Sequence, residues 1–264
     1  MAAIRPPPTV RPMSASAIAS LPLRPLRALQ PLSWLQRAWQ DIRRTPAASF
    51  GHGALLAAFG WLIVAVAQQR FWILAGAFSG FLLVAPILAT GLYAISRALE
   101  RGEPAGWSTV VAVWKSFDRR LVWFGLGLGA AGTGWVMTSA ALITLLAPQP
   151  VLTPVDFLQL VVSNRGSWVF ELWLGLGGLM AAPVFASSAI AIPLLLDRDM
   201  GVWDAILASW RVVAENPVPM AVWAALVMGL TMLGLVALML GLVLVIPLLG
   251  HATWYAYRDS LPPA

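Results

Sequence analysis

Long apolar runs alternate with short charged segments along most of the chain. The runs cover residues 51–67, 71–96, 121–146, about 168–196 and 219–257. None of them alternates polar and apolar positions, and each has at least 17 residues, which is about the shortest length of a helix that crosses a bilayer. Because lipid cannot hydrogen-bond free backbone groups, this pattern predicts helices. We therefore expect an all-α, polytopic helical membrane protein.

The last apolar run is too long for a single span. Its 39 residues would form a helix about 58 Å long at about 1.5 Å per residue. Two spans joined by a tight turn fit better, with Gly234 and Gly241 as candidate turn points. The expected total is six transmembrane helices.

An amphipathic pattern recurs before the spans. Trp107, Val110, Val111 and Trp114 share their spacing with Trp203, Ile206, Leu207 and Trp210, which is the spacing of one helix face. An earlier copy has Leu32, Leu35, Trp39 and Ile42, with Arg37, Asp41, Arg43 and Arg44 on the other side. We expect three tandem hairpins, each preceded by an interfacial helix, in units of about 32–104, 105–199 and 200–260.

Tryptophans mark these lead-in helices. Trp and basic residues prefer the headgroup level of a bilayer. The interfacial residues predicted on this basis are Trp39, Trp107, Trp114, Trp203 and Trp210. A docking platform for a partner protein is the alternative reading of the same helices.

Prolines and glycines recur within the spans. We expect Pro86, Pro183 and Pro247 to kink their helices. Small residues four apart, which let helix backbones approach closely in lipid, occur at Gly76/Gly80, Gly125/Gly129 and Ala225/Gly229. Gly127, Gly129 and Gly132 spell G-x-G-x-x-G, but inside an apolar span and with no preceding strand, so the motif does not indicate a dinucleotide site.

Composition supports the membrane assignment. Apolar types make up 59% of the 264 residues, charged types 11%, and cysteine is absent. An average soluble domain has roughly 25% charged residues. These values exclude an ordinary soluble enzyme, a disordered acidic protein, a nucleic-acid binder with a broad basic face and a disulfide-stabilised secreted domain.

Positive charge is concentrated at the beginning of the chain. The net charge is +6, and residues 1–44 hold seven arginines against one acid. Proline is frequent in residues 1–31, which we expect to be a disordered, basic cytoplasmic tail attracted to anionic lipid rather than to nucleic acid. Residues 32–260 would then form a single helical membrane domain.

The distribution of basic residues predicts the orientation. With six spans and a cytoplasmic N-terminus, the inner segments hold 15 of the 17 basic residues, and the outer loops hold only Arg70 and Arg165. This bias agrees with the positive-inside rule. It says little about the last hairpin, since Arg258 is the only basic residue beyond it.

Three titratable residues are candidates for a function within the spans. Glu171 lies near a span end, where it could pair with Arg165, and His52 and His251 also lie near span ends. A haem held by two histidines would require both rings to face each other, whereas a helix-end hydrogen bond is the commoner role. No cluster with ligand spacing indicates a metal site, and we expect no cofactor.

Three blocks carry a resemblance to a known family: GFLLVAPILATGLYAISRALERGEP (80–104), IAIPLLLDRDMGVWDAILASWRVVAENPVPMAVWA (190–224) and VIPLLGHATWYAYRD (245–259). Over roughly residues 32–260 the chain resembles a bacterial family of predicted integral membrane proteins, domain of unknown function 2189. The resemblance implies a multi-pass protein of the bacterial inner (plasma) membrane. Some relatives carry the label putative cytochrome c oxidase subunit, but two histidines are too few for a haem–copper centre.

These observations favour a non-enzymatic scaffold, accessory or assembly factor for a membrane complex, respiratory or other. The alternative is a small-solute transporter or channel, which would need a cavity reaching Glu171 or His251. An intramembrane enzyme would need paired catalytic groups, which the sequence does not reveal. The sequence does not indicate an oligomeric state.

Overall fold

The computed structural model describes residues 21–67, 73–77, 80–81, 88–116, 118–164 and 166–262. Within these ranges the chain is helical and contains no strand, so the all-α class is confirmed. The helices are α2 (Gln30–Arg44), α3 (Pro46–Ala67), α5 (Thr90–Glu100), α6 (Trp107–Lys115), α7 (Arg119–Leu146), α8 (Pro154–Asp156), the π-helix η1 (Phe157–Val162), α9 (Val169–Ser188), α10 (Ala191–Asp197), α11 (Val202–Glu215), α12 (Pro217–Val236) and α13 (Leu242–Ser260).

Four helical segments of the described chain are long and apolar enough to cross a membrane. They are Pro46–Ala65, Arg119–Leu146, Val169–Asp197 and Pro217–Val236. They correspond to the expected first, third, fourth and fifth spans. The expected second span (71–96) lies partly outside the described residues, and α13, at the place of the sixth, is more polar because it carries His251, Arg258 and Asp259.

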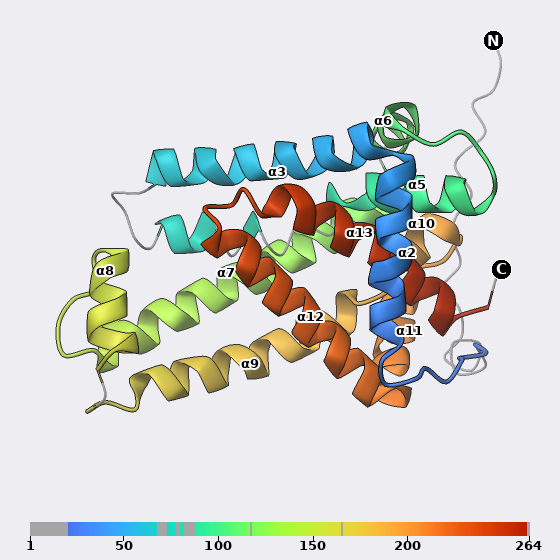
Figure 1. The fold of residues 1–264 in the computed structure, drawn as a ribbon. Helices are drawn as coiled ribbons and strands as arrows, with labels where there is room; N and C mark the ends of the chain where they lie inside the picture. Colours follow the sequence, from blue (N-terminus) through green and yellow to red (C-terminus); the bar gives the residue numbers. More distant parts are fainter. Residues whose placement is uncertain are drawn as a thin grey trace, which may run out of the picture.

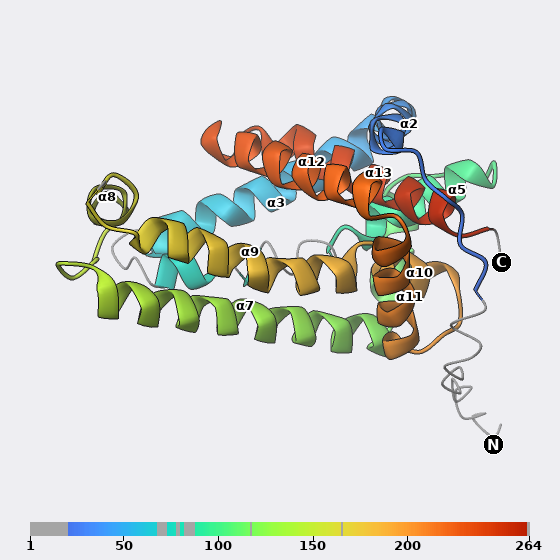
Figure 2. The same ribbon diagram turned by 90° about the horizontal axis from the view of Figure 1, so that it is seen from below.

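The long helices run between two different ends of the molecule. In Figure 1, α3, α7, α9 and α12 extend from an end occupied by α2, α5, α10 and α11 toward the end where α8 lies. Seen from below, α7 and α9 run side by side, apart from the layer that holds α3, α12 and α13 (Figure 2). The end around α2 and α11 carries most of the charged side chains and is called the charged end below.

Two of the joints between lead-in helix and span have the same geometry. A single residue separates the helices in each case, Thr45 before Pro46 and Asn216 before Pro217. Their φ and ψ angles are −132° and 53° for Thr45, and −128° and 55° for Asn216. Proline suits the first helical position because the missing N–H would be unsatisfied there. Trp39 and Trp210 each lie seven residues before the proline of their joint, so this equal spacing corresponds to equal local structure.

The chain reverses between α12 and α13 at residues 237–241. Leu238 and Met239 adopt left-handed φ angles of 53° and 61°. Gly234 and Gly241 lie on either side of the reversal, and a methyl group on Gly241 would lie only 2.8 Å from the Cα of Gly234. These glycines therefore permit the close approach of the two helices, while leucine and methionine make the turn.

The core of the molecule lies mainly at the charged end. Its largest side chains include Trp34, Trp223, Trp254 and Tyr257, which have at most 1% of their surface exposed. Trp34 meets Trp223 edge-on with 5.5 Å between ring centroids. By contrast, only 22% of the span residues of α7 and of α12 are buried within the chain.

The end of the expected tail packs against this core. The Leu26 amide donates to the Asn216 side chain at 2.8 Å, and the Arg24 amide donates to the Ser260 carbonyl at 3.0 Å. Residues 21–29 are thus held against α12 and α13. Residues 1–20 of the expected tail lie outside the described residues.

Candidate functional site

A network of polar side chains is buried at the charged end, where α2, α3, α5 and α13 meet. Asp41 Oδ2 accepts hydrogen bonds from Ser96 (2.7 Å) and from the Tyr255 hydroxyl (2.8 Å). His251 bonds Ser96 through Nδ1 (2.8 Å) and Ser49 through Nε2 (3.0 Å). The members of this buried polar network are Asp41, Thr45, Ser49, Ser96, His251 and Tyr255.

The joint between α2 and α3 places three members of the network on one side of these helices. Asp41, Thr45 and Ser49 are four residues apart, so they lie above one another across the α2–α3 joint. The Thr45 hydroxyl donates to the Asp41 carbonyl at 3.0 Å and lies 3.1 Å from Ser49 Oγ. The network therefore runs from the Asp41 carboxylate through Ser96 and His251 to Ser49, and Thr45 lies between Ser49 and the Asp41 carbonyl.

The hydrogen positions follow from Ser96. Its single hydroxyl hydrogen goes to Asp41, so the His251 Nδ1 must donate to Ser96 Oγ. The Nε2 of a neutral ring then accepts from Ser49. Both ring nitrogens of His251 are thereby engaged within the protein, and neither is free to bind a haem iron.

Asp41 is the only acid of the network, and just 1% of its surface is exposed. Burial raises the pKa of its carboxyl group, against the lowering effects of its bonds from Ser96 and Tyr255 and of the nearby Arg44 and Arg37 charges. The four helices thus enclose a carboxyl group whose ionisation is disfavoured.

The network contains the residue types of a nucleophile, a base and an acid. Ser49 is within hydrogen-bond reach of His251, and Nδ1 of His251 lies 3.9 Å from Asp41 Oδ2, with Ser96 bonded to both. Ser49 and His251 are, however, both fully buried. Ser49 Oγ therefore has no access to the surface, and the bonds of the network join four helices.

The second histidine lies beside the network without joining it. His52 is 1% exposed on α3 and faces α6, with its ring 5.7 Å from that of Trp107 and 5.2 Å from that of Trp114. Gly91 leaves room for it, since an added methyl group there would lie 2.8 Å from Cε1 of His52. His52 thus joins the lead-in helix α6 to the first span.

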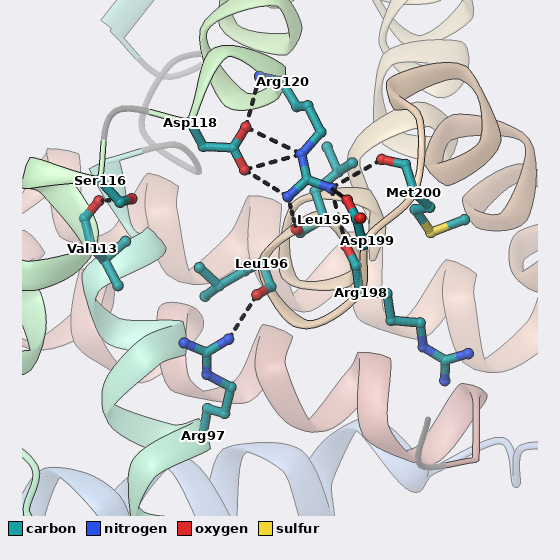
Figure 3. Close-up of polar contacts among 10 residues, drawn as sticks. All are labelled: Arg97, Val113, Ser116, Asp118, Arg120, Leu195, Leu196, Arg198, Asp199 and Met200. Carbon is teal, nitrogen blue, oxygen red and sulfur yellow. Dashed lines mark hydrogen bonds and ion pairs between the residues drawn. The ribbon is translucent and has the colours of Figure 1, made fainter. Parts of the chain in front are cut away.

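A second polar cluster joins α7 to the α10–α11 connection (Figure 3). The Arg120 guanidinium bonds Asp118 at 2.8 Å and also donates to the carbonyls of Leu195, Arg198 and Met200, at 3.1 to 3.2 Å. Arg97 of α5 donates to the next carbonyl, that of Leu196, at 2.7 Å. Two cations therefore satisfy carbonyls at the C-terminal end of α10, where helices leave them unpaired.

An apolar groove of about 910 Å³ lies beside this cluster, between α7, α9 and α11. Trp123 and Trp203, which are 65% and 75% exposed, line it together with the small residues Gly127 and Ala131. Pro183 lines it from α9. The groove is thus a hollow on an apolar outer surface.

The structure places the other predicted residues as follows. Glu171 lies exposed in the first turn of α9, and Arg165, its expected partner, lies outside the described residues. Pro183 and Pro247 lie inside α9 and α13, whereas Pro86 is not among the described residues, and kinks at these positions stay a prediction. The five interfacial tryptophans are between 39% and 75% exposed, and their position in a membrane also stays a prediction.

Sequence reasoning missed the centre of the network. Asp41 was expected on the polar side of its lead-in helix but lies buried with Trp34, Ala38 and Ile42. The reason is that Ser96 and Tyr255 supply donors to its carboxylate. The available signal was its spacing, since positions 34, 38 and 41 fall on one helix face.

The chain matches one known family. Residues 73–197 match a family described as "Predicted integral membrane protein (DUF2189)". The resemblance is confirmed over this segment, which is shorter than the expected 32–260. No curated protein and no solved structure matches the chain.

Proposed function

We propose that this integral membrane protein with a DUF2189 segment is a non-enzymatic scaffold or assembly factor that packs against the helices of a membrane complex. The observation that carries the proposal is a set of glycines whose side-chain positions are open. A methyl group added at Gly127, Gly129, Gly134 or Gly229 would meet no described atom within 4 Å beyond its own helix.

Open glycines on a membrane helix favour a partner. A glycine inside a helix costs about 1 kcal/mol relative to alanine. Packing against a second backbone can offset this cost, as at small-residue interfaces in lipid. The three glycines of α7 and Gly229 of α12 make no such contact with described residues of their own chain, so another protein is the natural source of it.

The polar groups support a scaffold over a transporter. His251 is fully buried within the buried polar network, and Glu171 is exposed at the far end of α9. Neither residue lines the apolar groove or a second pocket, which lies between α2, α5 and α13. A transport site near the bilayer midplane would bring such groups to a cavity.

The proposed topology has six spans in three tandem hairpins, with α13 as the sixth. The N-terminus would face the cytoplasm of a bacterial cell and the protein would reside in the inner membrane. The location of the arginine-rich helix α2, together with α6 and α11, at one end and of α8 at the other supports this orientation (Figure 1). Respiratory complexes are the partner class suggested by the family resemblance.

Co-purification from native membranes in mild detergent tests the scaffold. Gly127→Leu fills the apolar groove where space is open, and Leu126→Ile changes an exposed apolar side chain on the same helix. We expect a defined set of membrane proteins to accompany the wild type and Leu126→Ile but to be lost from Gly127→Leu. Recovery of the protein alone, or equal recovery of the set with both variants, would contradict the proposal.

A further inference from the structure

A pocket of about 380 Å³ lies between α2, α5 and α13 at the charged end, and arginines dominate its lining. Four arginines and two carboxylates face it: Arg24, Arg37, Arg44, Arg258, Glu100 and Asp259. Two positive charges are therefore in excess. This site is called the arginine pocket.

The two carboxylates already have partners. Glu100 accepts two bonds from Arg258, at 2.8 and 3.0 Å, and one from the indole of Trp254 at 3.0 Å. Asp259 Oδ2 accepts from Arg37 and from Gln30 and Trp34. These bonds hold both acids at fixed positions in the pocket wall.

The arginines retain unused donors. Arg24 and Arg44 are exposed, and their side chains make no hydrogen bond or ion pair with any described residue. Arg37 gives one nitrogen to Asp259, while its guanidinium group stacks 4.4 Å from the ring centroid of Tyr255. Stacking fixes the plane of a guanidinium group and leaves its other N–H groups pointing outward.

We infer that the arginine pocket binds a phosphate group, carried either by the headgroup of an anionic lipid or by a soluble phosphate compound. Guanidinium groups match phosphate oxygens with paired, charge-assisted hydrogen bonds. The pocket volume suits a headgroup or another small phosphate ester, being at the low end of the range for ligand sites. The proposal is independent of the scaffold function, because it concerns a different surface.

The pocket adjoins the buried polar network. Tyr255 lines the pocket with its ring and donates its hydroxyl hydrogen to Asp41. A phosphate bound by Arg37 and Arg44 would therefore lie next to the contacts that join α2 to α13. Binding should raise the thermal stability of the helix assembly, since a ligand that binds only the folded state stabilises it.

Titration calorimetry on the purified full chain in neutral detergent tests this site. The probes are phosphatidylglycerol, phosphatidylcholine as the neutral comparison, and inorganic phosphate. The double variant Arg24→Gln/Arg44→Gln removes the two unpaired cations without freeing either carboxylate. Arg27→Gln/Arg43→Gln, at exposed positions that do not line the pocket, removes the same charge and is the matched control.

We expect the wild type and the control pair to bind at least one anionic probe, and the pocket pair to bind it about tenfold more weakly or worse. Preference for phosphatidylglycerol over inorganic phosphate identifies a lipid headgroup site, and the reverse preference identifies a soluble phosphate ligand. Equal affinities of the two double variants would overturn the inference, as would equal binding of phosphatidylcholine. Thermal unfolding of both double variants without ligand shows whether either is misfolded. If Arg24→Gln/Arg44→Gln is misfolded, the single variant Arg44→Gln takes its place, and we expect it to bind the anionic probe more weakly as well.

Discussion

At the residue scale, Asp41 is the most informative position in the molecule. Burial and four surrounding helices make its ionisation unfavourable, whereas Asp118 is stabilised as an anion by Arg120. The two carboxyl groups therefore make opposite contributions to stability as the pH changes. The difference arises because burial outweighs the hydroxyl donors at Asp41, whereas at Asp118 the bonds from Arg120, whose guanidinium group lies at 2.8 Å, outweigh burial.

Replacing Asp41 by asparagine should alter the pH dependence of stability. The folded pKa of Asp41 lies above its ordinary value of 3.8, so the protein is most stable with this group protonated and loses that stability as pH rises through the folded pKa. Asparagine keeps an oxygen for Ser96 and Tyr255 but cannot ionise. As the pH rises above the ordinary pKa of 3.8, we expect the Tm of Asp41→Asn to improve relative to wild type, as followed by tryptophan fluorescence in detergent.

Asp118→Asn is the control with the opposite sign. Burial raises the pKa of Asp118, but hydrogen bonds from the Arg120 side chain and backbone outweigh that effect and lower it. Its stabilising contribution is present above the ordinary pKa and lost as pH falls. The Tm of Asp118→Asn should therefore worsen relative to wild type as pH rises, and equal trends for the two variants would refute the assignment of the Asp41 environment.

The sequence identifies both histidines as candidate residues but does not show which side chains they contact. His52 and His251 were identifiable as the only histidines of the chain, and both proved to be buried at helix contacts. Their partners were not identifiable, because Asp41 and Ser49 are 210 and 202 positions from His251. Hydropathy and spacing report local structure, whereas contacts over such distances depend on how the helices pack.

At the element scale, the contact between α3 and α13 shows how glycine positions decide packing. A methyl group added at Gly53 would collide with the carbonyl group of Val243 and lie 2.7 Å from its Cα. A methyl group added at Gly60 would lie 2.8 Å from the sulfur of Met239, in the turn before α13. The position of a span could be predicted from the sequence because the length of an apolar run is a local property. The span predicted at 121–146, for example, agrees with helix α7 at Arg119–Leu146. The sequence could not show which glycines face another helix, because that depends on which helix packs against each span.

Gly53→Ala should separate α3 from α13. The colliding atoms belong to the backbone, so relief requires a helix shift, and overpacking of this kind costs about 1–3 kcal/mol. Gly229→Ala is the matched control: it adds the same methyl group to a span, where no described atom lies within 4 Å, and should stabilise an isolated chain by up to about 1 kcal/mol. Thermal unfolding in detergent measures both, and a Gly53→Ala protein as stable as wild type would contradict the close contact.

At the scale of the whole molecule, the central question is how the charged end relates to the membrane. The lead-in helices α2, α6 and α11 each precede a span, and the ends of α5, α10 and α13 return to the same region (Figures 1 and 2). Basic side chains are frequent there, and the positive-inside rule therefore favours the proposal that this end faces the cytoplasm. The return of α13 to this end is the structural basis for proposing a sixth span despite its polar second half.

The absence of native cysteine allows this topology to be tested by single-cysteine labelling. Arg43→Cys and Lys115→Cys place a thiol at exposed positions of the charged end, Gln149→Cys places one in the loop near α8, and a cysteine appended after Ala264 reports the C-terminus. A membrane-impermeant maleimide added to intact spheroplasts should label only Gln149→Cys, because the other three thiols would face the cytoplasm. All four should react once the membrane is permeabilised. Labelling of Arg43→Cys in intact spheroplasts would show that the orientation is the reverse of the one proposed. If only Gln149→Cys and the appended cysteine were labelled, residues 219–257 would cross the bilayer only once.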